Sequence, residues 1–231
     1  MKYKYLLAIL FFAATSFFIS CKRNAEDYTY LSKHATQIGQ AITGDTIVGT
    51  VKGSLLPNKT YYMTGNVIVN KGDTLLFNSG DTILVVSPAA YIVVHGMLLS
   101  IGTQAAPIWI TVPGIAKNNT PAAAASPQSD SAFLSKSQWC GIQCDTSCNL
   151  LVIKWTHIEF VGASFLSQPL PALSVGKTSW PIYFGNSNGY FILEDSWIYG
   201  NVDDAIRIQG GKINFMRNTF EKSGFTGGGQ L

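Results

Sequence analysis

The sequence predicts an all-β solenoid, in which short strands stack in parallel from one coil to the next. The first observation is a repeat: residues 67–85 are echoed by residues 91–111, at an offset of about 22–25 residues. The second is that each copy holds three short β-rich runs separated by Gly, Asp or Asn. Such short runs cannot bury an apolar face alone, so we expect equal coils to bury it by stacking.

The repeat also predicts which residues lie in line. Ile68 aligns with Ile92 and Leu75 with Leu99, so like side chains are expected to form ladders inside the stack. Antiparallel partners would instead be joined by hairpin turns of two to five residues, as is usual for such pairs. The aligned copies therefore favour parallel pairing.

The third of the three runs in each copy recurs downstream as three further strands. A partner strand follows each of them. The third strands are at residues 141–144, 181–184 and 205–208, and the partners at residues 156–160, 197–199 and 218–220. The long step from Ile142 to Ile182 predicts one coil that carries a loop at residues 163–178, with two irregular coils as the alternative.

Several strings together support a named resemblance. They are Gly-Asp-Thr-Leu-Leu-Phe, Gly-Asp-Thr-Ile, Ile-Val-Val-His-Gly-Met-Leu, Gly-Thr-Gln-Ala-Ala-Pro-Ile-Trp-Ile-Thr and Trp-Cys-Gly-Ile. Over residues 44–224 the chain resembles right-handed parallel β-helix lipoproteins of the pectate-lyase-like superfamily, of the Bacteroidetes type. The resemblance implies a single-stranded right-handed parallel β-helix. It does not settle activity, because the superfamily includes lyases, hydrolases, adhesins and proteins of no known chemistry.

The N-terminus predicts a signal peptide over residues 1–20. Lys2 and Lys4 precede an apolar stretch at residues 6–18, which ends just before Cys21. A cysteine after a small residue resembles the bacterial lipobox, although Phe18 stands where the motif usually has Leu. The resemblance implies that Cys21 carries the lipid (palmitate) and that the membrane is a partner. An ordinary secretory signal and a membrane anchor are the alternatives.

Residues 21–43 are expected to tether the domain at residues 44–231. Residues 29–42 predict either a short amphipathic capping helix or an unstructured spacer. Glu26 and Asp27 resemble surface-export signals, so we expect an outer membrane lipoprotein at the cell surface, with a periplasm-facing anchor as the alternative. The chain stops after a strand and turn without a recognisable cap, which predicts that the β-helix domain is truncated.

The charge of the mature chain excludes one class of partner. The chain has 16 basic and 13 acidic residues, and removal of Lys2 and Lys4 leaves 14 and 13. The sequence holds no basic stripe of the kind that neutralises phosphates. Nucleic acid is therefore not expected as a partner.

Period-two alternation nominates a binding face. If the isoleucines of the third strands point inward, the residues between them point outward and stack in one column. The column is Leu84, Trp109, Gln143, Tyr183 and Arg207. Aromatic faces, an amide and a guanidinium suit a polysaccharide or cell-surface glycan, so Trp109, Gln143, Tyr183 and Arg207 are the candidate ligand-binding residues. Alternatively, the aromatic residues only stabilise their cross-strand neighbours.

A second candidate site lies at Asp203 and Asp204, close to Arg207. These residues resemble in miniature the sites of β-helix hydrolases and lyases, and two adjacent carboxylates can divide into acid and base or bind Ca²⁺. A Gly-His-Gly turn and an Arg-x-Lys pair are both missing from the sequence. We therefore expect glycan binding without catalysis, with a polysaccharide lyase or glycoside hydrolase as the alternative and no cofactor beyond Ca²⁺ for a lyase.

Three cysteines remain besides Cys21. Cys140, Cys144 and Cys148 have spacings that suit no tight zinc site, so no metal is expected there. In an exported protein Cys144 and Cys148 are expected to form a disulfide across a turn. Alternatively, Cys140 and Cys144 are small core residues.

Overall fold

The chain consists of β strands wherever the structure describes a regular element. A computed structural model of the 231-residue chain describes residues 39–115, 117 and 138–224. These residues form strands and no helix, which confirms the all-β prediction. The strands are β1 (Ala41–Ile42), β2 (Thr46–Thr50), β3 (Gly53–Leu55), β4 (Thr60–Val69), β5 (Thr74–Asn78), β6 (Thr82–Val85), β7 (Ile92–Val94), β8 (Met97–Ile101), β9 (Ile108–Thr111), β10 (Ile142–Cys144), β11 (Leu150–Lys154), β12 (Thr156–Glu159), β13 (Ile182–Phe184), β14 (Tyr190–Glu194), β15 (Trp197–Tyr199), β16 (Ile206–Ile208), β17 (Lys212–Met216) and β18 (Thr219–Glu221).

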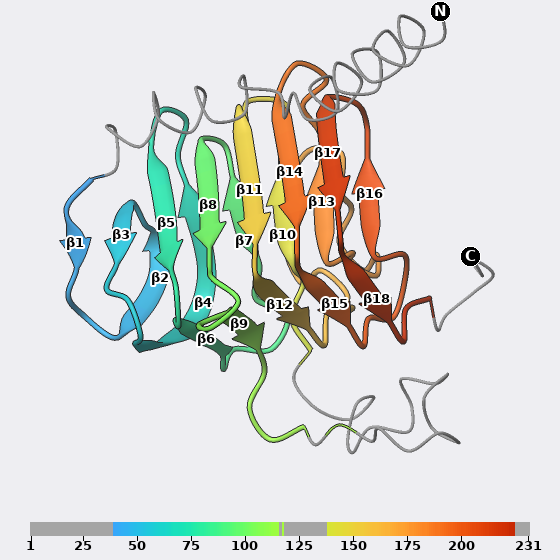
Figure 1. Cartoon of the computed structure of the whole chain (residues 1–231). Helices are drawn as coiled ribbons and strands as arrows, with labels where there is room; N and C mark the ends of the chain where they lie inside the picture. Colours follow the sequence, from blue (N-terminus) through green and yellow to red (C-terminus); the bar gives the residue numbers. More distant parts are fainter. Residues whose placement is uncertain (1–38, 116, 118–137, 225–231) are drawn as a thin grey trace, which may run out of the picture. The chain divides into compact units, whose positions relative to one another are not determined.

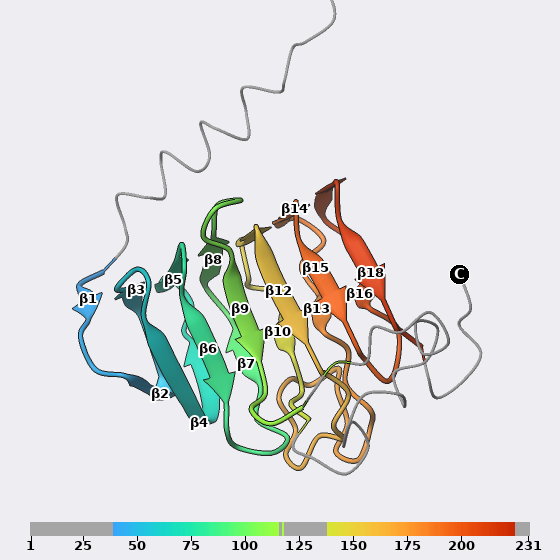
Figure 2. The same ribbon diagram turned by 60° about the horizontal axis from the view of Figure 1, so that its bottom comes forward.

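Two sheets hold these strands, and every pairing between named strands is parallel (Figure 1). The seven-stranded sheet has the order β1-β3-β5-β8-β11-β14-β17. The eleven-stranded sheet has the order β16-β13-β10-β7-β4-β6-β9-β12-β15-β18, with β2 beside β4. In Figure 2, strands β6, β9, β12, β15 and β18 of this larger sheet lie side by side.

Three consecutive strands make one coil. In the coil of β7, β8 and β9, the middle strand joins the smaller sheet and the other two join the larger sheet. The long strand β4 connects the halves of the larger sheet, because its residues 60–63 pair with β6 and its residues 67–69 pair with β7. This arrangement is consistent with a parallel β solenoid.

The predicted register of the first two coils is wrong by one residue. Ile92 pairs with Val67, and Ile68 pairs with Val93. The pairing of β5 with β8 differs from the predicted one in the same way. Because strand side chains alternate, a shift of one residue exchanges the two faces. These runs are apolar on both faces, since Val93 is itself buried on the outer side, so their composition did not reveal which residues point inward.

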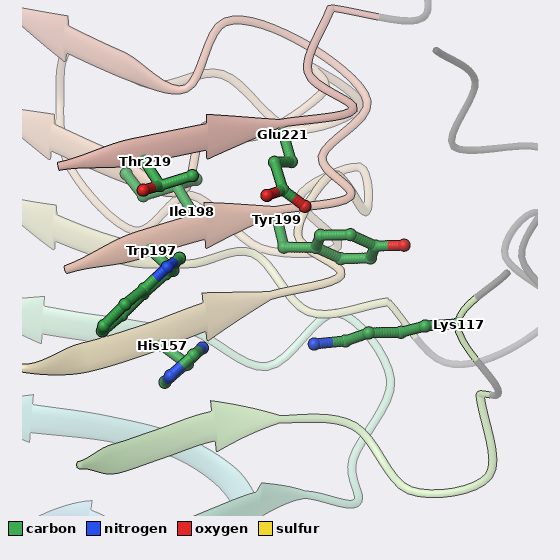
Figure 3. A pocket seen from close by; sticks show the side chains of 7 residues that line it. All are labelled: Lys117, His157, Trp197, Ile198, Tyr199, Thr219 and Glu221. Carbon is green, nitrogen blue, oxygen red and sulfur yellow. The ribbon is translucent and has the colours of Figure 1, made fainter. Parts of the chain in front are cut away.

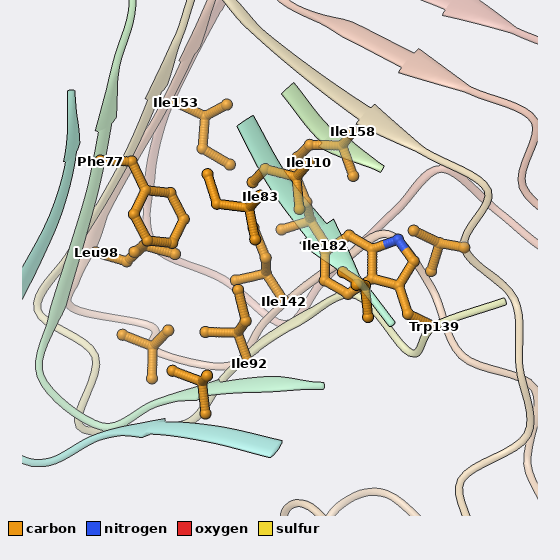
Figure 4. Close-up of a cluster of buried hydrophobic side chains, with 14 of the residues drawn as sticks. Phe77, Ile83, Ile92, Leu98, Ile110, Trp139, Ile142, Ile153, Ile158 and Ile182 are labelled. Atoms are coloured by element: carbon orange, nitrogen blue, oxygen red, sulfur yellow. The ribbon is translucent and has the colours of Figure 1, made fainter. Parts of the chain in front are cut away.

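Apolar side chains fill the interior of the stack (Figure 4). Two ladders of isoleucines run through it, Ile83, Ile110, Ile158 and Ile198 in one half of the larger sheet and Ile92, Ile142 and Ile182 in the other. All are at most 1% exposed. Burial of each such side chain contributes about 1.5–3 kcal/mol, so the ladders are a main source of stability.

A second apolar cluster lies outside the coil. Phe165, Leu170 and Leu173 pack against Val93 and Tyr183, which belong to β7 and β13. The segment at residues 163–180 thus covers the outer face of these strands. Ile142 and Ile182 pair directly on neighbouring strands, which confirms that the long step is a single coil carrying a loop.

Several predictions fall on residues outside the described part of the chain. These are the signal peptide over residues 1–20, Cys21, the tether up to residue 38, and the end of the domain at residues 225–231. Ala41 and Ile42 form strand β1, so the predicted capping helix does not extend to residue 42. Among the described residues, no helix has the length and hydropathy needed to cross a membrane.

Replacement of Gly96 by alanine should destabilise the fold. A Cβ at this position would lie 2.2 Å from the backbone oxygen of Asp73 and 2.3 Å from that of Asn70. We expect Gly96→Ala to lower the free energy of unfolding by about 1–3 kcal/mol, measured by denaturant titration. As a control, Gly44→Ala, where a Cβ meets nothing within 4 Å, should change it by less than about 0.5 kcal/mol. Equal effects of the two substitutions would contradict the tight stacking of the coils.

Candidate functional site

The structure divides the predicted binding column between two halves of the larger sheet. Trp109 lies on β9, in register with His157 of β12. Gln143, Tyr183 and Arg207 are in register with one another on β10, β13 and β16. The prediction of a single column is therefore wrong. Its cause is that an isoleucine followed two residues later by an apolar residue occurs in β9 as well as in β10 and β13, so the pattern alone does not identify the strand.

Gln143 and Tyr183 do not face solvent. The Gln143 side chain is buried, and its Nε2 donates hydrogen bonds to the backbone oxygens of Cys140 and Trp180. Tyr183 is only 5% exposed, and its ring stacks on Trp180 with centroids 6.1 Å apart. Alternation placed both side chains outside the coil correctly, but the segment at residues 163–180 covers them. Arg207 is exposed.

Three aromatic side chains stack on the outer face of β9, β12 and β15, and we call them the aromatic column. The rings of Trp109 and His157 have centroids 3.6 Å apart and planes 7° apart. The rings of His157 and Trp197 have centroids 4.4 Å apart and planes 3° apart. A sequence signal existed, because each residue directly precedes an isoleucine of one inward ladder. Aligning β12 and β15 with β9 would have found the column.

A buried carboxylate lies at one end of these strands. Glu159 is 2% exposed and accepts a hydrogen bond from Thr111 Oγ1 at 2.8 Å. The Lys117 ammonium forms an ion pair with Glu159. Lys117 Nζ also lies 4.5 Å from the ring centroid of Tyr199 and 5.2 Å from that of Trp109. The ammonium thus compensates the buried negative charge and faces aromatic rings on two coils.

These side chains border a small cleft of about 130 Å³. It is lined by Lys117, His157, Trp197, Ile198, Tyr199, Thr219 and Glu221. Figure 3 shows the Lys117 ammonium pointing toward the rings of His157 and Trp197, with Tyr199 on the same strand as Trp197 and Glu221 on the neighbouring strand β18. Sites for drug-sized ligands have volumes of about 300–1,000 Å³, so this cleft accommodates one small group at a time.

The environment of His157 keeps its imidazole neutral. Burial, together with the positive charge of Lys117, lowers the pKa of His157 to about 4. His157 Nδ1 lies 3.9 Å from Glu159 Oε1. At neutral pH the aromatic column is therefore uncharged, and the charges of the site are those of Lys117 and the two glutamates, Glu159 and Glu221.

The predicted catalytic residues are not assembled into one site. The Asp203 carboxylate accepts a hydrogen bond from the backbone N–H of Asp204, which is a local turn contact. Within the described part of the chain, no ion pair joins Arg207 to Asp203 or Asp204. The described residues also contain no group of three or more His, Cys, Asp or Glu side chains placed to hold a metal ion.

All three described cysteines are free thiols buried in apolar surroundings. The disulfide predicted between Cys144 and Cys148 is not formed in the structure; both residues pack within the coil interior. Burial raises the pKa of Cys144 well above its ordinary value, and the neighbouring Cys148 thiol adds to this effect. Burial likewise raises the pKa of Cys140 to about 12. The thiols therefore behave as small core side chains.

Sequence reasoning missed two carboxylates at turns between strands, the half-buried Asp145 and the buried Asp81. Asp145 accepts hydrogen bonds from His95 Nδ1 at 2.6 Å and from Ser147 Oγ at 2.7 Å. Burial would raise the pKa of Asp145, but hydrogen bonds from Ser147 and His95 outweigh it and lower the pKa. Burial raises the pKa of Asp81 to about 6, although backbone N–H donors of Asn78 and Lys59 oppose the rise.

The chain matches no protein-family model, no curated protein sequence and no solved structure. The functional argument therefore rests on the geometry of the chain's own residues.

The low pKa of His157 predicts a pH dependence of stability. An ordinary histidine has a pKa of about 6.5, so between pH 6.5 and 4 the unfolded chain binds a proton that the folded chain excludes. The stabilisation is present above pH 6.5 and is lost as the pH falls toward 4, by up to about 3 kcal/mol. We expect His157→Phe, followed by urea titration at several pH values, to remove this loss.

Asp81 changes stability in the opposite direction over the same pH range, because its folded pKa is raised to about 6. The quantity to measure is therefore the difference between the unmodified chain and His157→Phe, in which the contribution of Asp81 cancels. The same pH dependence in both proteins would contradict the burial of His157 in the aromatic column.

Proposed function

We propose that this protein is an exported, lipid-anchored right-handed parallel β-helix protein that binds a polysaccharide or cell-surface glycan without catalysis. The observation that supports binding most directly is the cleft between Trp197 and Tyr199, which Lys117 and Glu221 border. It combines apolar aromatic surface with a cation and an anion at one accessible place.

The chemistry of the cleft suits a sugar. Sugar rings offer apolar C–H groups to aromatic side chains and hydroxyls to charged or polar groups. Trp197 supplies the aromatic surface, the largely buried Tyr199 closes one wall of the cleft, and Glu221 is an exposed hydrogen-bond acceptor. Both faces of the His157 ring are covered by indoles. His157 therefore holds Trp197 in place and does not itself stack on a ligand.

The size of the cleft limits the mode of binding. A volume of about 130 Å³ suits one sugar residue or one substituent, and a longer glycan would continue along the outer face of β9, β12, β15 and β18. The repeated coils supply such an elongated face, since each coil adds an equivalent strand in parallel.

The proposed handedness rests on strand connection geometry. Parallel strands in one sheet are joined by right-handed crossovers in about 98% of cases, and neighbouring coils here pair through parallel strands, to which this preference applies. Together with the resemblance of the sequence strings, this supports a right-handed β-helix of the pectate-lyase-like superfamily.

Glycan binding should depend on Trp197. We expect Trp197→Ala to weaken retention at least tenfold, or about 1.4 kcal/mol, because the cleft loses its aromatic wall. The measurement is affinity electrophoresis through gels that contain one polysaccharide each, across neutral and acidic polymers. Glu221→Gln changes only an exposed polar group of the cleft, so it tests the same site without loss of packing and should also weaken retention.

The matched control is Tyr62→Ala, since Tyr62 is 41% exposed on β4 and does not line the cleft. Retention by Tyr62→Ala should equal that of the unmodified chain. Loss of retention in the control alone, or retention of no polymer by any of these proteins, would contradict the proposal. Release of unsaturated products or reducing ends would instead support the lyase or hydrolase alternative.

The proposed anchor predicts the behaviour of Cys21. In a bacterial host, the full chain should fractionate with membranes and incorporate labelled palmitate, because a diacylated cysteine inserts its chains into the bilayer. Cys21→Ser should abolish labelling, while Cys140→Ser should leave it unchanged. Equal labelling of Cys21→Ser and the unmodified chain would show that Cys21 is not the lipidated residue.

A further inference from the structure

Two cations lie beside one aromatic ring, that of Trp180. This place is next to β13 and β16, away from the aromatic column on β9, β12 and β15. Lys177 Nζ lies 4.9 Å from the ring centroid of Trp180. The guanidinium carbon of Arg207 lies 5.8 Å from the same centroid. Both side chains are exposed, whereas Trp180 is 6% exposed. Positive charges from two separate segments of the chain thus lie beside the same indole.

Neither cation is neutralised by a carboxylate. Within the described part of the chain, no acidic side chain lies within 4.0 Å of Lys177 or Arg207. Elsewhere, Lys154 pairs with Glu194 and Arg217 pairs with Asp195. An aromatic face attracts an exposed cation only weakly and does not neutralise its charge. The arrangement is thus electrostatically suited to an added negative charge.

One further hydrogen-bond donor at this place has no acceptor. Trp180 Nε1 is buried and makes no hydrogen bond in the structure. A buried donor that has no acceptor destabilises the structure, because its hydrogen bond to water is lost and not replaced. Tyr183, stacked on Trp180, lies close enough to Arg207 for the guanidinium to oppose the rise in its pKa that burial causes.

We propose that Lys177, Arg207 and Trp180 form a binding site for an oxyanion, namely a sulfate, phosphate or carboxylate group. The guanidinium offers parallel donors that match two oxygens of such a group, and the ammonium adds a point charge. The indole N–H supplies an additional donor once the long side chains adjust around the ligand. The site does not depend on the glycan cleft, because it uses other residues.

The test follows the indole N–H signal of Trp180 in two-dimensional NMR spectra of the full chain, kept in solution with a mild detergent. Trp180→Phe identifies the signal. Sodium sulfate, sodium phosphate and sodium acetate are titrated separately against sodium chloride at constant ionic strength. We expect a saturable shift with at least one oxyanion and none with chloride. A response to acetate alone identifies a carboxylate site, and a response to sulfate or phosphate identifies a tetrahedral one.

Variants then distinguish a site from general screening. Arg207→Gln and Lys177→Gln should each raise the apparent Kd at least fivefold. Lys71→Gln, which removes an exposed lysine of another coil, should leave it unchanged. The proposal is overturned if no oxyanion gives a saturable shift, or if Arg207→Gln and Lys177→Gln bind as the unmodified chain does. Failure here leaves retention of glycans through Trp197 unaffected, so the two proposals can fail separately.

Discussion

The in-register parallel pairing of each strand with its equivalent in the next coil is the constraint on which this structure depends. Short strands such as β7 and β10 have only three residues and bury their backbone polar groups only by pairing on both sides. Because the pairing is residue by residue, Ile110, Ile158 and Ile198 stack in one ladder. A slip of one residue would move every one of these side chains out of the core.

The same register builds the candidate site on the outer face. Trp109, His157 and Trp197 directly precede the isoleucines of that ladder, so the register that aligns the isoleucines also aligns the rings. Each aromatic pair contributes about 0.5–1.5 kcal/mol beyond burial. Stacking covers both faces of the central ring, so the aromatic column is mainly structural. Surface for a ligand remains on Trp197, where the side chain borders the cleft.

The sequence predicts the stacking of the coils, but it does not predict which side chains share a column or which of them are covered. The repeated strings predicted parallel stacking. The pairing of Ile142 with Ile182 shows that the prediction of a single coil across the long loop was also correct. The prediction that Trp109 and Gln143 lie in one column failed, because β9 and β10 carry the same alternating pattern but occupy different positions in the larger sheet. Gln143 does point out of the coil, yet it is buried. Its cover comes from the segment at residues 163–180, which has no periodicity from which its packing could be predicted.

The central claim is that coil register places His157 between two indoles. The most direct measurement is a set of nuclear Overhauser effects from the His157 imidazole protons in solution. The structure predicts strong contacts to the rings of both Trp109 and Trp197, whose centroids lie 3.6 Å and 4.4 Å away. Contacts between Trp109 and the side chain of Gln143, with none between Trp109 and His157, would show that the strands pair in a different order and would contradict the account.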